Sequence, residues 1–218
     1  RKGYINKLAE EIYTTVKSYD VKLPNNKVTK PTSFKKAGNL PQPQWFQAEA
    51  KERDGMLKFQ TWDNLDRKLI TQEIRKKALR CHHLYDIKRD LSAKNRVVVN
   101  GSRQHEDTYS DTTSPVAGQL LLRLFLAITA FRRYMIIQLD LTNAYLHAPI
   151  QDVVYIYIPE GFPNAGDIAR LRKAAYGTKQ GARRFYDYTR QVLTHIGLTQ
   201  CPNDPCLFRY LYKGAACF

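Results

Sequence analysis

The sequence predicts an α+β fold with a mixed or antiparallel sheet and helices packed against it. Three segments, at 45–59, 116–131 and 181–196, have the length and the apolar pattern of helices. Runs rich in β-branched and aromatic residues lie between and after them, at 84–90, 95–100, 135–139, 153–158, 169–172 and 206–211. Because strands and helices alternate irregularly along the chain, a doubly wound parallel sheet is not expected.

The charge of the chain indicates a polyanionic partner. Its 218 residues include 35 Lys and Arg against 20 Asp and Glu, which gives a formal net charge of +15. Hydrophobic residues make up 43% of the chain and charged residues 25%, so neither a wholly disordered protein nor a membrane protein is expected. A surface this basic attracts nucleic acid first and acidic membranes second. Four scattered cysteines and the lack of a signal-peptide pattern favour an intracellular setting.

Residues 1–44 are expected to form a basic, largely flexible linker. Lysines, prolines and asparagines are spread through this segment, a composition typical of linkers. Within it, residues 4–19 carry apolar side chains at spacings of three and four and predict a short amphipathic helix. The composition changes at Trp45, where apolar residues at near-helical spacing predict a helix over 45–59.

A hairpin and a buried helix are predicted next along the chain. Strands at 84–90 and 95–100 are joined by a polar, basic segment at 91–94, which predicts a β-hairpin with cations at its tip. The segment 116–131 is apolar almost all round, as a buried core helix requires. It is interrupted by Arg123 and is too short to span a bilayer comfortably.

The second half of the chain is expected to combine short strands with one long helix. The runs at 153–158 and 169–172 are expected to pair with each other, and the run at 206–211 is expected to be a further strand. Residues 181–196 have apolar and aromatic side chains at helical spacing, and this helix is expected to end at Gly197.

Asp140 is the first residue that suggests chemistry. It follows the β-branched run at 135–139 and precedes a short helix-like run at 141–146. As an N-cap, Asp140 would accept hydrogen bonds from the first amides of that helix. As a metal ligand, its carboxylate at a strand end would suit Mg²⁺ bound together with substrate phosphates. The residue alone leaves both interpretations open.

Around Asp140 the sequence resembles a known family. The runs Gln138–His147 and Arg170–Gln180, with Pro159–Phe162 between them, resemble motifs of the reverse transcriptase of copia-type long-terminal-repeat retrotransposons. Further motifs of that family occur in the same order: Trp45 with Ala48 and Glu52, Thr61–Trp62, Arg96–Gln104, Ser114–Val116 and Asp204–Phe208. The resemblance extends from about Trp45 to Phe218.

The resemblance implies a polymerase with fingers and a palm. Residues 45–115 would be the fingers, and 116–218 would be the first part of the palm, truncated before the family's aromatic-X-Asp-Asp turn. Asp140 would be the first catalytic aspartate and would bind two Mg²⁺ ions, with the backbone carbonyl of Leu141 as a further ligand. Tyr145 resembles the aromatic gate beneath the sugar of the incoming nucleotide, and core packing is its compatible alternative role.

Further positions are implied to contact the substrates. Lys94 and Arg96 resemble fingers residues that grip the triphosphate, with a solvated basic turn as the alternative for both. Gln180 resembles a glutamine that contacts the incoming nucleotide and the template strand, and Lys179 and Arg183 are implied to bind nucleic acid. The sequence departs from the usual family pattern at Thr178, Gly181–Ala182 and Asn100–Gly101.

The implied activity is RNA-directed DNA polymerisation with two Mg²⁺ ions. The implied partners are a primed RNA or DNA template, dNTPs, and the integrase and RNase H regions of the same polyprotein, with no membrane, and the implied location is cytoplasmic particles or the nucleus. Because Asp140 alone would hold two divalent cations poorly, this chain by itself is predicted to lack polymerase activity. The alternative is a catalytically inactive retrotransposon remnant that only binds nucleic acid.

Overall fold

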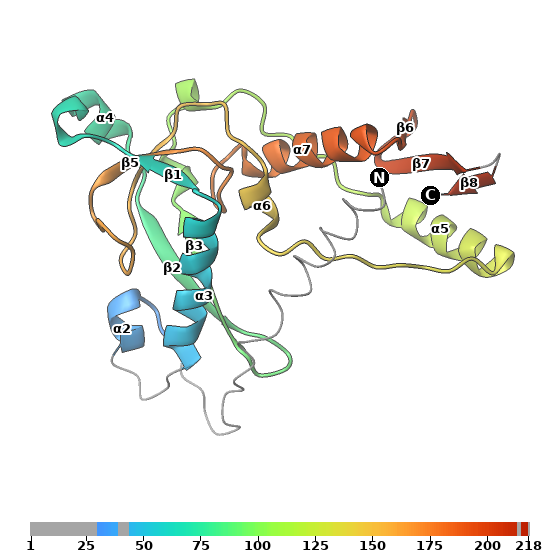
Figure 1. Cartoon of the computed structure of the whole chain (residues 1–218), viewed down its shortest axis with the longest axis horizontal. Coiled ribbons are helices and arrows are strands. Elements are labelled where there is room, and N and C mark those ends of the chain that lie inside the picture. The colour runs from blue at the N-terminus through green and yellow to red at the C-terminus, as the bar shows by residue number, and fades with distance from the viewer. Residues whose placement is uncertain (1–29, 39–43, 213–214, 218) are drawn as a thin grey trace.

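A computed structural model of the protein describes residues 30–38, 44–212 and 215–217. The amphipathic helix expected at 4–19 and most of the expected linker lie outside the described residues. The described part combines helices with antiparallel sheets (Figure 1), which confirms the α+β prediction. The division into fingers and palm stays a prediction.

The first sheet joins strands that are far apart in the sequence. It has the order β1-β5-β4, formed by β1 (Trp62–Asn64), β5 (Ile168–Leu171) and β4 (Tyr155–Tyr157), and both pairs are antiparallel. The predicted pairing of 153–158 with 169–172 is therefore confirmed. The strand β1 extends this sheet on the other side of β5.

The second sheet is the predicted hairpin, with its turn earlier in the sequence than expected. Strands β2 (Cys81–Ile87) and β3 (Ala93–Val99) pair in antiparallel register. The turn at 88–92 is closed by Asp90, whose Oδ1 accepts hydrogen bonds from the amide and the hydroxyl of Ser92. Because this local turn fixes the register, the prediction that Lys94 lies in the turn is wrong: Lys94 is in β3, opposite Asp86.

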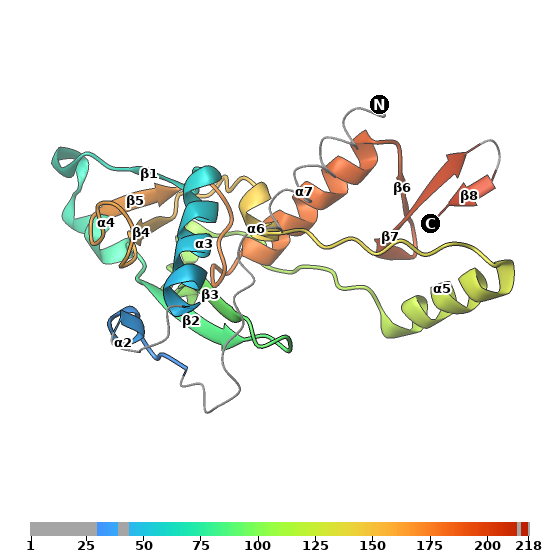
Figure 2. The same ribbon diagram turned by 60° about the horizontal axis from the view of Figure 1, so that its bottom comes forward.

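Two helices cover the hairpin. The helix α3 (Gln44–Lys58) confirms the helix predicted at 45–59 and packs along β3 (Figures 1 and 2). The short helix α2 (Phe34–Gly38) lies within the segment expected to be a linker. Its Ala37 is buried with Trp45 of α3 and Tyr85 of β2, so residues of this segment contribute to a folded cluster.

The main core lies between the first sheet and the base of the hairpin. Leu79 connects them, because its amide donates to the Tyr155 carbonyl (2.9 Å) and its carbonyl accepts from the Tyr157 amide (2.9 Å). The core contains Met56, Leu79, Val97, Val99, Leu146, Ile150, Val154, Ile156, Ile158, Phe162, Ala169, Leu171 and Ala175. Short helical segments lie in the connections between the larger elements: η1 (Arg67–Leu69), α4 (Gln72–Lys77), η2 (Gly101–Arg103), η3 (Glu106–Thr108) and α6 (Ala144–His147).

The helix α7 (Gly181–His195) leads from this core to a third sheet (Figure 2). The predicted helix at 181–196 is confirmed, and Gly197 follows it with φ of +100°. The third sheet has the order β6-β7-β8, formed by β6 (Thr199–Cys201), β7 (Asp204–Tyr212) and β8 (Ala215–Cys217). The strand predicted at 206–211 is confirmed within β7.

The apolar helix is where the structure departs most from prediction. The helix forms, as α5 (Gln119–Arg132), but Thr129 is its only buried residue, so the prediction of a core helix is wrong. Figures 1 and 2 show α5 standing away from the sheets, because the unpaired segments on either side carry it outward. The strand predicted at 135–139 is likewise wrong: these residues form no strand, and Met135 and Leu139 are 86% and 82% exposed.

No helix in the described part of the chain is long and apolar enough to cross a membrane.

A pair of glycines lets two backbone segments touch at the end of the hairpin. The Val99 amide donates to the Tyr176 carbonyl (2.8 Å), which joins β3 to the turn before α7. Gly177 has φ of +87°, and a Cβ atom there would lie 2.1 Å from the Val99 carbonyl oxygen. A Cβ atom at Gly101 would lie 2.0 Å from the Gly177 carbonyl oxygen. Only glycine fits at either position.

We expect Gly177→Ala to lower the free energy of unfolding by about 2–5 kcal/mol, because left-handed strain adds to the clash with Val99. The matched control is Gly166→Ala, since Gly166 has φ of +88° but no atom within 4 Å of an added Cβ. Gly166→Ala should lower the free energy of unfolding by about 1–2 kcal/mol, because it adds left-handed strain without a clash. Urea denaturation would measure both, and equal losses would contradict the backbone contact.

Candidate functional site

Asp140 lies in an extended segment that leads into α6. Its side chain is exposed, and Leu141 beside it is 39% exposed. The N-cap interpretation of Asp140 is wrong, because α6 begins at Ala144 and its N-cap residue is Asn143, which has a left-handed backbone (φ 54°). The carboxylate of Asp140 therefore does not cap the N-terminus of α6.

Lys94 and Arg96 lie on the same face of β3. The strand alternates, with Asn95, Val97 and Val99 buried on the opposite face, so residues 94 and 96 point away from the core. Burial lowers the pKa of Lys94, and the neighbouring charges of Arg96 and Lys88 lower it further. The carboxylates of Asp140 and Asp86 act in the opposite direction. Asp140 is thus near enough to this cationic face to interact with it.

Arg96 rests on a group of aromatic rings, which we call the aromatic shelf (Tyr145, Tyr176 and Phe185). The Arg96 guanidinium carbon lies 5.5 Å from the centre of the Tyr176 ring. Tyr145 meets Tyr176 edge to face at 4.5 Å and Phe185 at 5.7 Å between ring centres. Burial raises the pKa of Tyr176, Arg96 lowers it, and Asp140 is among the anions that raise it. Tyr176 of the aromatic shelf thus contacts Arg96 and interacts electrostatically with Asp140.

A partly buried carboxylate lies close to these cations. Glu52 projects from α3, and its Oε1 accepts a hydrogen bond from the Val97 amide (3.0 Å). Burial raises the pKa of Glu52, while the Val97 hydrogen bond, Arg96 and Lys94 partly oppose this shift. Glu52 thus connects α3 to the strand that carries both cations.

Sequence patterns assigned no functional role to Glu52 or to Tyr176. A signal for Glu52 existed, because Trp45, Ala48 and Glu52 share one helix face, and an acidic residue on a buried face needs a partner. Tyr176 had no comparable signal, since its position beneath Arg96 depends on the glycine contact between β3 and the turn.

Gln180 is completely buried and lies in a hydrogen-bond network. Its Oε1 accepts from Gln104 Nε2 (2.8 Å), and its Nε2 donates to the Thr108 carbonyl (3.1 Å) and to Asp152 Oδ2 (3.3 Å). In this arrangement the side chain has no surface to offer a nucleotide. A direct contact would require these bonds to be exchanged, so the expected contact stays a prediction.

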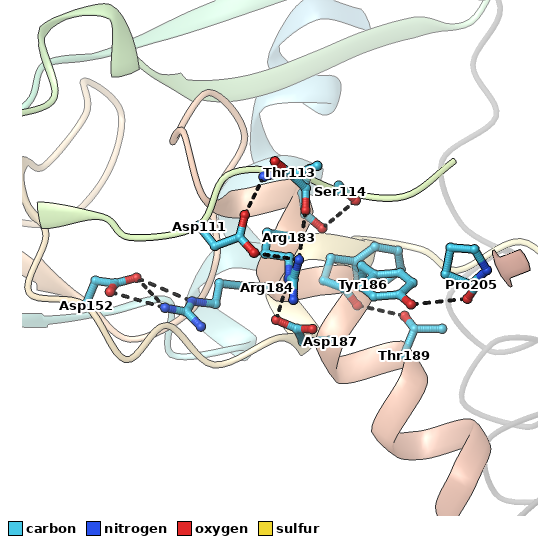
Figure 3. A network of polar contacts seen from close by, with 12 residues as sticks. Asp111, Thr113, Ser114, Asp152, Arg183, Arg184, Tyr186, Asp187, Thr189 and Pro205 are labelled. Atoms are coloured by element: carbon cyan, nitrogen blue, oxygen red, sulfur yellow. Dashed lines mark hydrogen bonds and ion pairs between the residues drawn. The ribbon is translucent and has the colours of Figure 1, made fainter. Parts of the chain in front are cut away.

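Lys179 and Arg183 are both held by one segment, residues 104–114, which we call the strap. The Lys179 ammonium donates to the Tyr109 hydroxyl (2.7 Å) and lies 4.6 Å from the centre of its ring. Arg183 forms an ion pair with Asp111 of the strap (2.7 Å) and another with Asp187 of α7 (3.0 Å; Figure 3). Both cations therefore have protein partners.

The structure places the predicted residues in two neighbouring groups. Asp140, Lys94, Arg96 and Tyr145 lie around the aromatic shelf, whereas Lys179, Gln180 and Arg183 lie around the start of α7. The groups meet where Tyr145 contacts Phe185 of α7. The two groups together contain cations, aromatic rings and exposed carboxylates, among them Asp140 and Asp111.

The described residues do not by themselves form a metal site. Among them, no group of three or more His, Cys, Asp or Glu side chains could hold a metal ion. Asp140 with the carbonyl of Leu141 does not fit two Mg²⁺ ions, each of which needs several oxygen ligands. The cations and aromatic rings of this arrangement can bind phosphate groups and a nucleoside ring.

The sequence of the chain matches a known protein family and several known proteins. Residues 60–215 match the family described as "Reverse transcriptase (RNA-dependent DNA polymerase)". The Transposon Ty1-NL1 Gag-Pol polyprotein of Saccharomyces cerevisiae is 32% identical over 168 residues, and the Transposon Ty1-DR4 Gag-Pol polyprotein of the same yeast is 32% identical over 170 residues. Each match covers 76% of this chain and 10% of the relative, so the chain spans about a tenth of their length. No solved structure gives a significant match.

The pH dependence of stability should reveal Glu52. Because its folded-state pKa is raised, the stability linked to its protonated form is fully present below the unfolded-state pKa and is lost as pH rises through the folded-state pKa. Glu52→Gln keeps an acceptor for the Val97 amide without the buried charge. We therefore expect the variant to gain stability relative to the parent as pH rises from about 4 to about 8.

Urea denaturation across this pH range is the measurement. Glu106→Gln, at an exposed glutamate of η3, is the control and should show no such pH-dependent gain. A difference between Glu52→Gln and the parent that is independent of pH would contradict the buried charge.

Proposed function

We propose that this chain, which belongs to the reverse transcriptase (RNA-dependent DNA polymerase) family of copia-type retrotransposons, binds the nucleoside triphosphate and the primed template of an RNA-directed DNA polymerase. One observation carries the proposal. This observation is the grouping of Arg96 over the Tyr176 ring, with Tyr145 in contact with Tyr176. The Asp140 carboxylate interacts electrostatically with Lys94 and Tyr176 of the same group. A triphosphate needs fixed cations, and a nucleoside sugar needs a flat surface beside them.

Arg96 is the main triphosphate contact in this proposal. Its guanidinium offers several N–H donors in a fixed plane, and the cation–π contact with Tyr176 limits where that plane can lie. Lys94, two residues earlier on the same face, adds a second positive charge. Burial lowers the pKa of Lys94 most and the neighbouring Arg96 and Lys88 lower it further, and an anionic ligand would offset the repulsion among these cations.

Tyr145 is proposed to lie beneath the sugar. Its ring is partly buried and contacts both Tyr176 and Phe185, so core packing and sugar contact are compatible roles. Asp140 and the Leu141 carbonyl are the groups of the described chain that would face a Mg²⁺-bound triphosphate. Two Mg²⁺ ions are the proposed cofactor, and oxygen ligands beyond these two groups would be needed to hold them.

The nucleic-acid contacts are proposed at the start of α7. Lys179 and Arg183 would bind backbone phosphates, and Gln180 would act near the nucleotide and the template strand.

The domain division and the partners are also part of the proposal. Residues 45–115 would serve as fingers and 116–218 as the first part of the palm. Integrase and RNase H regions of a polyprotein are proposed partners, and an intracellular particle is the proposed location.

A remnant that only binds nucleic acid is the alternative, and binding assays separate it from the main proposal. A remnant would bind primed template without binding dNTPs. Template-dependent primer extension that Asp140→Asn abolishes would favour the polymerase.

We expect Arg96→Gln to weaken dNTP binding by at least about tenfold, because it removes a charge-assisted contact worth about 1.5–3 kcal/mol. Isothermal titration calorimetry with dTTP and Mg²⁺ would measure the affinity. Arg170→Gln is the matched control, since Arg170 is an exposed arginine on β5 of the first sheet. Equal affinities for the two variants would contradict the assignment of Arg96.

A further inference from the structure

The strap contacts both cations that are proposed to bind nucleic acid. Lys179 donates to the hydroxyl of Tyr109, and Arg183 pairs with Asp111 and donates to the carbonyl of Thr113 (3.2 Å). Figure 3 shows Asp111, Thr113 and Ser114 lying against Arg183 and the first turn of α7. Oxygen atoms of the strap therefore occupy the donors that phosphate oxygens would need.

A phosphate can replace the contacts that the strap makes with Arg183. The side chains of Asp111 and Arg183 are 53% and 28% exposed, and exposed ion pairs contribute about 0–1 kcal/mol. Solvent reaches this pair, and a phosphate can replace the Asp111 carboxylate with little loss. A phosphodiester offers the same anionic oxygen chemistry as the carboxylate that it would displace.

Arg184, the next residue, provides a contrast within the same helix turn. Its guanidinium makes a bidentate pair with Asp152, and both side chains are less exposed, at 20% and 17%. Asp152 also accepts a hydrogen bond from the buried Gln180. Arg184 therefore anchors α7 to the core, whereas Arg183 pairs with the exposed Asp111 of the strap and with the less exposed Asp187 of its own helix.

The two ends of the strap are fixed to different degrees. At its beginning, Gln104 is 5% exposed, donates to Gln180 Oε1 and accepts from the Lys179 amide (3.0 Å). At its end, Asp111 and Thr113 are exposed, and Ser114 makes one longer hydrogen bond to the Ala182 carbonyl (3.3 Å). Residues 109–114 can therefore leave α7 while Gln104 stays in place.

We propose that residues 109–114 compete intramolecularly with the phosphate backbone of a primed template for Lys179 and Arg183. This inference rests on the proposed function of those two cations. In the free protein, Asp111 and Tyr109 occupy the donors, and binding of nucleic acid displaces them. The strap thereby lowers the affinity for weakly bound anions and favours a ligand that presents several phosphates in a row.

A double-mutant cycle tests the competition. The affinity of a fluorescently labelled RNA–DNA primer–template would be measured by anisotropy at constant salt for the parent, Asp111→Asn, Arg183→Gln and the double variant. Asp111→Asn should tighten binding about two- to fivefold, the equivalent of an exposed ion pair. In the Arg183→Gln background the same change should have much less effect.

Asp54→Asn is the control for a general change of charge. Asp54 pairs with Arg53 on α3, and its side chain is 59% exposed, close to the 53% of Asp111. Tightening by Asp54→Asn equal to that by Asp111→Asn would overturn the competition, as would an Asp111 effect that persists undiminished without Arg183. If Arg183→Gln binds like the parent, the proposed phosphate contact of Arg183 itself fails, which is a separate result.

Hydrogen exchange gives a second, independent measurement. The amides of residues 109–114 should exchange faster when the protein is saturated with primer–template, because the segment has left α7. Slower exchange on binding would overturn displacement and would mean that the strap itself contacts the nucleic acid.

Discussion

The contact between the end of β3 and the turn before α7 determines the geometry of the candidate site. The Val99 amide bonds to the Tyr176 carbonyl, and the absence of side chains at Gly101 and Gly177 allows the two backbones to approach. This one junction places Tyr176 beneath Arg96, brings Tyr145 against Tyr176, and sets the start of α7 beside the strap. Residues more than seventy positions apart therefore meet through a few backbone atoms.

The cations that are proposed to bind ligands lie close to carboxylates in the described part of the chain. Arg183 and Arg184 each have carboxylate partners, and Lys94 and Arg96 have Glu52 behind them. These carboxylates reduce the repulsion among the cations that the fold gathers on one face. A ligand anion must therefore replace or supplement internal partners at these positions, and it does not meet bare charges.

Local sequence patterns predicted the elements whose partners are close in the chain. The hairpin follows from alternating residues around a turn, and the helix at 181–196 follows from its apolar spacing. The position of Lys94 was missed because the Asp90 side chain closes the turn early. The exposure of α5, the unpaired segment at 135–139 and the burial of Gln180 were missed because periodicity reveals an apolar or polar face but not which distant segment covers it. The family that the resemblance indicated is confirmed, and the roles it implies for single residues stay predictions.

The backbones that carry Arg96 and Asp140 differ in how firmly they are held. Arg96 belongs to a two-stranded ladder whose strands are hydrogen-bonded along their length and backed by α3. Asp140 lies in an extended segment outside any strand. The cationic half of the site is therefore preorganised, while the carboxylate can shift without breaking a backbone ladder. An anion bound at Arg96 would repel the Asp140 carboxylate, so a cation between the two would be needed to hold the aspartate in a fixed position.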